Sequence, residues 1–211
     1  MLAFGGCETS YQAKQVKPSG FLDYSLLRKG GEGEALYVYR NPKADFSTYD
    51  KVLFDKVMVW RGKGSTLNDF SQEDLQCLGS LLRNKVLAAL SSDYEIVYES
   101  GPGVMRIQVA LTELEKSSTV MDTISTVLPA ALALSEVKRV TTGTHAFVGK
   151  ASIEGKITDG QTGELLLAAV DRRTGGKRLE GKTSSLHQVE EIYQFWADRL
   201  SQRLREWRIH K

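Results

Sequence analysis

The feature that most constrains the fold is a pair of long segments in which apolar and polar residues alternate. Apolar side chains occupy every second position of residues 105–111, and residues 147–158 repeat the pattern. Successive side chains of a strand point to opposite faces of a sheet, so this alternation is typical of strands with one buried face. Sheets with one solvated face are usually antiparallel. The two segments therefore predict two long strands of a mainly antiparallel sheet.

Other segments supply further strands. Residues 159–163, DGQTG, form a tight connection after the second long strand, and residues 164–171 are the expected return strand of a hairpin. Residues 52–60, VLFDKVMVW, are rich in β-branched and aromatic side chains on both faces, as in a strand inside a sheet. Short aromatic strands are also expected at residues 35–39 and 94–98.

Two segments have helical spacing of apolar residues, at 75–89 and at 189–207. Ser71 with Asp74, and Ser185 before the second segment, are N-terminal capping residues. The order of strand, helix, strands and helix predicts an α+β domain, with a mainly antiparallel sheet of about five strands and two long helices packed on one face.

Composition limits the class of protein. The 211 residues are 41% hydrophobic, which suffices for one globular core. The 28 basic and 26 acidic side chains give a net charge of +2, far from the basic excess of nucleic-acid-binding domains. No apolar run approaches the ~18 residues of a transmembrane helix. A single globular domain with no nucleic-acid partner and no membrane-spanning helix is therefore predicted.

Residues 117–144 separate the two long strands, although a hairpin needs only a few residues there. Pro129 kinks this inserted helical segment or begins a second helix. One interpretation is a helical crossover that covers the sheet. The other is an amphipathic arm for a partner subunit or a membrane surface. The apolar residues that would form this interaction face are Ile124, Val127, Leu128 and Leu132.

Residues 171–178 are the densest basic cluster, expected on a loop after the hairpin. They form either a solvated loop or a binding site for an anionic partner such as peptidoglycan carboxylates, lipid phosphates or a protein. The candidate interaction residues of this cluster are Arg172, Arg173, Lys177 and Arg178. Paired carboxylates such as Glu113 and Glu115 are expected at ordinary solvated positions.

The sequence predicts no catalysis, no metal and no cofactor. Its histidines, His145, His187 and His210, have no spacing that suits a metal or a catalytic triad. Cys77 falls beside the apolar stripe of the first helix and is interpreted as a packed thiol. A disulfide between Cys77 and Cys7 is not the favoured interpretation.

The first residues suggest a location. In Leu2-Ala3-Phe4-Gly5-Gly6-Cys7, small residues precede a cysteine, as at the end of a bacterial lipoprotein signal peptide. The upstream part of such a signal is missing, which points to a start codon further upstream or to a trimmed leader. The alternative is a free cysteine in a loose terminus.

Several short motifs together resemble a Gram-negative lipoprotein family, domain of unknown function 3313. They are PSGFL (residues 18–22), YVYRNP (37–42), DKV (50–52), GTHAFVG (143–149) and the stretch from Asp159 through Thr162-Gly163-Glu164 to Asp171-Arg172-Arg173. The resemblance implies lipid attachment at Cys7, an anchor in the inner leaflet of the outer membrane and a domain on its periplasmic face. It brings no known activity or ligand.

The hairpin is also similar to one in the curli-secretion channel lipoprotein. We therefore predict a lipobox remnant and tether at residues 1–35 and one periplasmic α+β domain at 36–211. Its expected role is a binding or assembly module of the cell envelope, with an envelope protein or peptidoglycan as partner. One alternative is a membrane-associated component, or a homo-oligomer, that assembles through residues 120–140. Another is an envelope enzyme or small-ligand carrier with a pocket under that segment.

Overall fold

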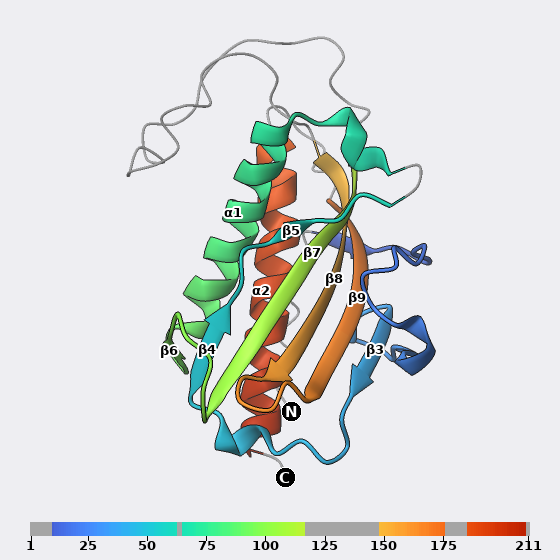
Figure 1. Cartoon of the computed structure of the whole chain (residues 1–211). Helices are drawn as coiled ribbons and strands as arrows, with labels where there is room; N and C mark the ends of the chain where they lie inside the picture. The colour runs from blue at the N-terminus through green and yellow to red at the C-terminus, as the bar shows by residue number, and fades with distance from the viewer. Residues whose placement is uncertain (1–9, 63–64, 117–147, 176–184, 210–211) are drawn as a thin grey trace, which may run out of the picture.

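The computed structural model describes residues 10–62, 65–116, 148–175 and 185–209, in which one sheet lies against a layer of two helices (Figure 1). The strands within these ranges are β1 (Ser10–Gln12), β2 (Arg28–Lys29), β3 (Tyr37–Arg40), β4 (Lys51–Phe54), β5 (Met58–Val59), β6 (Glu95–Ile96), β7 (Val104–Lys116), β8 (Val148–Asp159) and β9 (Leu165–Gly175). The helices are α1 (Gln72–Leu90) and α2 (Ser185–Ile209). The predicted α+β class is confirmed.

The strand order is β2-β3-β9-β8-β7-β4-β6, with β1 also paired to β9 and β5 to β7. The long strands β7, β8 and β9 are antiparallel, as predicted, whereas β4 and β5 run parallel to β7 and β6 runs parallel to β4. The sheet is therefore mixed. The prediction of about five strands is too low, because β1, β2 and β5 have only two or three residues each and cannot display an alternation. Residues 52–60 do not form one strand but are divided between β4 and β5.

Both helices cover the same face of the sheet and pack against each other (Figure 1). Ser71 caps α1 by accepting a hydrogen bond from the backbone N–H of Asp74, as the sequence predicts. Helical spacing then aligns the apolar residues of α1 on one buried stripe. The buried residues of this stripe are Leu75, Leu78, Leu82, Val86 and Leu90. The hydrophobic core lies between this stripe, α2 and the inner face of the sheet.

The opposite face of β8 differs from the sequence prediction. Alternation correctly assigns Ala151 and Ile157 to the core and Ser152 and Glu154 to the other face. That face was expected to meet solvent, yet Ser152 and Glu154 are fully buried. The reason for Glu154 is long-range, because residues 19–24, far away in the sequence, pack over it.

Several chain connections meet at one end of the sheet, which we call the β1 end. Here Ser10 of β1 is the register partner of Gly175, the last residue of β9. Lys116, the last residue of β7, is the register partner of Val148, the first residue of β8. Residues 117–147 are therefore joined to the domain at this end, beside the start of β1. Among the described residues, neither helix has an apolar stretch long enough to cross a membrane.

Candidate functional site

Residues 10–36, which we call the docked segment, lie along the side of the sheet formed by β9 and β3 (Figure 1). The segment enters as β1, which pairs with the last residues of β9, and it ends beside β3, to which β2 is paired. The sequence analysis assigned residues 1–35 to a lipobox remnant and tether, and the structure shows where residues 10–35 contact the domain. Three buried charged side chains of β8 and β9 hold the docked segment in place: Glu154, Asp171 and Arg173.

Glu154 on β8 holds the middle of the docked segment. Its Oε1 atom accepts hydrogen bonds from the Ser19 backbone N–H at 3.0 Å and from the Tyr24 hydroxyl at 2.9 Å. Its Oε2 atom accepts from the Leu22 backbone N–H at 3.1 Å. Burial, and next the hydrogen bond to Glu154, raises the pKa of Tyr24 far above its usual range, so Tyr24 remains a donor. These donors replace the water that a buried carboxylate loses.

Asp171 on β9 receives three N–H donors from three parts of the chain. Its Oδ1 atom accepts from Gln12 Nε2 at 2.7 Å and from the Leu36 backbone N–H at 3.3 Å. Its Oδ2 atom accepts from Trp196 Nε1 at 2.8 Å. Burial raises the pKa of the Asp171 carboxyl, and the bonds from Trp196 and Gln12 oppose that rise. One carboxylate thus joins both ends of the docked segment to α2.

Arg173 fixes β1 itself. Its guanidinium donates to Ser10 Oγ at 2.9 Å and to the Ser10 carbonyl oxygen at 2.6 Å. Its Cζ atom lies 3.4 Å from the centre of the Phe195 ring, where the charge meets the negative face of the aromatic system. Ser10 is 1% exposed and Arg173 is 3% exposed. The first described residue of the chain is thus firmly held.

Aromatic contacts complete the dock, by which we mean the set of contacts that attaches the docked segment to the rest of the domain. The rings of Phe21 and Trp60 meet edge to face with centroids 5.5 Å apart, and Trp60 Nε1 donates to the Ser19 carbonyl oxygen at 3.0 Å. Lys156 Nζ lies 5.7 Å from the centre of the Phe21 ring. A hollow of about 250 Å³ opens beside these residues, toward the hairpin between β8 and β9.

Arg172 and Arg173 do not form the joint basic surface that the sequence analysis considered. They belong to β9 and not to a loop, so strand alternation sends their side chains to opposite faces. Arg172 pairs with Glu115 and, at 3.3 Å, with Glu113. Lys150 also binds Glu115, at 2.8 Å. Glu113 and Glu115 are therefore partners in a cross-strand charge cluster and not solitary solvated carboxylates.

The remaining predicted site residues have different outcomes. The ones that lie outside the described residues are Cys7, Ile124, Val127, Leu128, Leu132, Lys177, Arg178, His145 and His210. A pocket under residues 117–144 lies outside them too. Cys77 is half-buried on α1, and burial raises the pKa of its thiol. Within the described parts of the chain, no group of three or more His, Cys, Asp or Glu side chains could hold a metal ion.

Sequence reasoning missed Glu154, Asp171 and Arg173 as the residues that organise the docked segment. Asp171 left a signal, because it directly follows the apolar run LLLAAV of residues 165–170, where a solvated carboxylate is unexpected. The sequence contains no such signal for Glu154, because a glutamate at an outward position of an alternating strand is ordinarily exposed.

The fold and the dock define a class of protein: an α+β domain with two helices on one face of its sheet and an N-terminal segment attached by buried charged side chains. The chain belongs to a family of proteins of unknown function, DUF3313, whose pattern matches residues 17–200. The resemblance to this family is thereby confirmed. No curated protein matches the chain. The likeness to the curli-secretion channel stays a prediction.

Several solved structures are similar to this chain. One is a PelC dodecamer from Paraburkholderia phytofirmans, with 13% identity and a TM-score of 0.41 over 78% of this chain and 94% of that one. A candidate lipoprotein from Caulobacter crescentus CB15 has 12% identity and a TM-score of 0.40, over 79% and 95%. A DUF4136 family protein from Bacteroides thetaiotaomicron VPI-5482 has 11% identity and a TM-score of 0.35, over 80% and 95%.

Proposed function

We propose that the protein is a lipid-anchored module of the bacterial envelope that binds or assembles other envelope components at the periplasmic face of the outer membrane. Cys7 is the lipid attachment point in this proposal. The observation that carries it is the position of Ser10, which is buried in the sheet only three residues after Cys7. An envelope protein or peptidoglycan is the proposed partner.

The short distance to the anchor has a mechanical consequence. Three extended residues span about 10 Å, so an acylated Cys7 would keep Ser10 within about that distance of the membrane surface. Ser10 is in turn held by two hydrogen bonds from Arg173. The β1 end would therefore face the membrane, and the hairpin between β8 and β9 would point into the periplasm.

The proposal includes no catalysis. The buried carboxylates Glu154 and Asp171 each accept three hydrogen bonds from groups that position the docked segment. These bonds give both carboxylates a structural task. A catalytic base needs instead a lone pair that can reach substrate.

Assembly through residues 120–140 is a second candidate function. It is favoured by the register pair of Lys116 and Val148, which attaches residues 117–147 to the domain at the β1 end. A segment in that position would meet either the membrane or a neighbouring copy anchored in the same leaflet. Sedimentation of the full chain over a concentration series tests this idea, and a monomer at every concentration would contradict it.

The anchor is tested by the mass of the N-terminal tryptic peptide from envelopes of a Gram-negative host that expresses the full gene. We expect an acylated Cys7 at a new N-terminus and recovery of the protein in the outer-membrane fraction. In the control, Cys7→Ser, the protein should leave that fraction while its fold is unchanged. An unmodified peptide of residues 1–14 would refute the anchor.

A further inference from the structure

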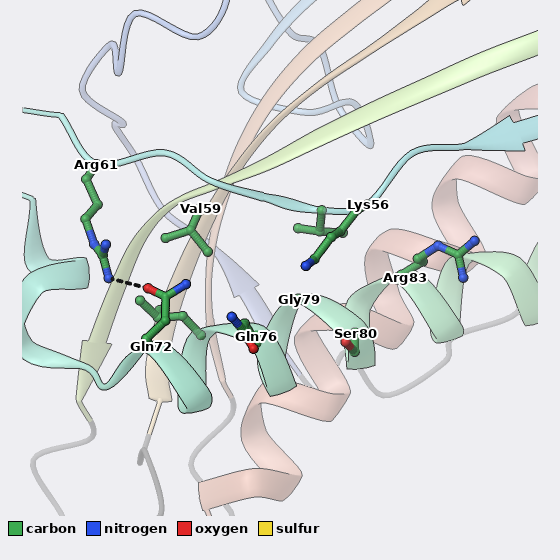
Figure 2. A pocket seen from close by; sticks show the side chains of 10 residues that line it. Lys56, Val59, Arg61, Gln72, Gln76, Gly79, Ser80 and Arg83 are labelled. Carbon is green, nitrogen blue, oxygen red and sulfur yellow. Dashed lines mark hydrogen bonds between the residues drawn. The ribbon is translucent and has the colours of Figure 1, made fainter. Parts of the chain in front are cut away.

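A hollow of about 270 Å³ lies between the chain around β5 and the N-terminal half of α1 (Figure 2). Its floor is apolar and includes Val57 and Leu75. Gly79 keeps the floor open, because a side chain there would begin 3.5 Å from Val57. The rim is polar and consists of Lys56, Arg61, Gln72, Gln76, Ser80 and Arg83.

Among the described residues, the lining of this hollow carries three positive charges and no negative charge. Asp55, the neighbour of Lys56, lies outside the lining, and its carboxylate is bound by Arg106 at 2.8 Å. Glu73 and Asp74 of α1 are also absent from the lining. A concave surface lined by one sign of charge raises the local concentration of ions of the opposite sign.

The cationic groups retain donors for a ligand. Arg61 Nη2 donates to the neutral amide oxygen of Gln72 at 3.2 Å, and no acidic side chain in the described part of the chain forms an ion pair with Arg61. Lys56 and Arg83 have no ion-pair or hydrogen-bond partner among the residues that the structure describes. In Figure 2, Arg61 and Arg83 occupy opposite ends of the hollow, with Lys56, Gln76 and Ser80 between them.

We propose that this hollow binds an anion with two or more phosphate groups. Gln72, which contacts Arg61, and Arg83 are eleven residues apart on α1, or about 16 Å along a helix axis. One phosphate group cannot contact both ends of a hollow of this length, whereas several linked phosphates can contact more than one of the three cationic side chains. Arginine forks bind phosphate oxygens in pairs, and Lys56 adds a point charge between the two forks. The apolar floor would contact the uncharged linking part of the ligand.

Two probes test this site on the full chain. Inorganic tripolyphosphate in solution, titrated by calorimetry, represents a free polyanion. Vesicles that contain cardiolipin, whose headgroup carries two phosphates, represent a lipid surface. Phosphatidylcholine vesicles are the neutral reference. We expect each of Lys56→Gln, Arg61→Gln and Arg83→Gln to weaken binding by about threefold to tenfold, because each removes a charge-assisted contact at an exposed site. These surface substitutions should leave the unfolding temperature unchanged.

Lys85→Gln is the matched control, since Lys85 is on the same helix and outside the lining. The binding constant of Lys85→Gln should change by less than about twofold, because this substitution lowers the net charge but removes no contact to the ligand. Binding of tripolyphosphate identifies a free polyanion as the ligand class, and binding of cardiolipin vesicles alone identifies a lipid headgroup. The proposal is overturned if neither probe binds, or if Lys85→Gln weakens binding as much as the rim substitutions do.

Discussion

At the scale of single residues, Asp171 is the most demanding position in the dock. All its partners are N–H donors, on Gln12, Leu36 and Trp196. A carboxylate accepts with both oxygens, whereas an amide has one oxygen and one NH₂ group. In Asp171→Asn, the introduced NH₂ group must therefore face at least one of these three N–H donors. We expect a loss of about 1–3 kcal/mol in the free energy of unfolding, measured by urea denaturation.

A double-mutant cycle with Trp196→Phe isolates this effect. The substitution removes the indole donor, so the NH₂ group of the introduced amide could point at the former indole site without meeting a donor. The loss in Asp171→Asn plus Trp196→Phe should then be smaller than the sum of the two single losses, by about 0.5 kcal/mol or more. Additive losses would show that a clash between the amide NH₂ group and the Trp196 donor is not the cause of the loss in Asp171→Asn.

Glu154→Gln makes the same exchange beneath the middle of the docked segment. At least one of the Ser19 and Leu22 backbone N–H groups should lose its acceptor, because the amide offers a single oxygen. We expect hydrogen exchange of these two amides to become about tenfold faster or more, while exchange in the cores of β7 and β8 stays slow.

Tyr24→Phe is the matched comparison for Glu154→Gln. It removes the hydroxyl donor to Glu154 and leaves both backbone bonds in place. Its effect on the Ser19 and Leu22 amides should therefore be smaller. Equal exchange rates in the native protein and in Glu154→Gln would mean that aromatic packing of Phe21 on Trp60 holds the segment without the carboxylate.

At the scale of elements, the long periodic segments and the short aromatic strands β3 and β6 were predictable, whereas β1 and β2 were not. β7 and β8 display an alternation over many residues, and α1 has both a capping serine and a helical stripe. β1 and β2 have three and two residues, and their pairing with β9 and β3 comes from tertiary contacts. The dock was unpredictable for the same reason, since Glu154 and Ser19 are 135 residues apart.

The register of β7 and β8 gives a direct test of residues 117–147. Because Lys116 and Val148 are paired, a two-residue Asn-Gly turn can replace the whole segment and close the hairpin. If these residues are an interaction arm, the shortened protein should keep a cooperative unfolding transition close to that of the full chain, measured by circular dichroism. A loss of cooperative unfolding would mean that the segment belongs to the core.

At the scale of the whole molecule, the position of β1 predicts the orientation of the anchored domain. β8 has 12 residues, so its two ends lie about 40 Å apart. A fluorescent donor at position 11, on the exposed side chain of β1, would mark the β1 end. A donor at position 161, in the hairpin between β8 and β9, would mark the far end. Cys77→Ala in both variants leaves one reactive thiol for the dye.

Energy transfer from these donors to acceptor lipids in vesicles measures the two heights. In the lipidated protein we expect strong transfer from position 11 and weak transfer from position 161, because the three residues after Cys7 reach only about 10 Å. A 20-residue Gly-Ser linker between Thr9 and Ser10 adds a flexible reach of about 25 Å and should reduce the difference between the two donors. Equal transfer from both positions without the linker would contradict the proposed orientation, whereas a difference that disappears only with the linker assigns it to the short connection between Cys7 and β1.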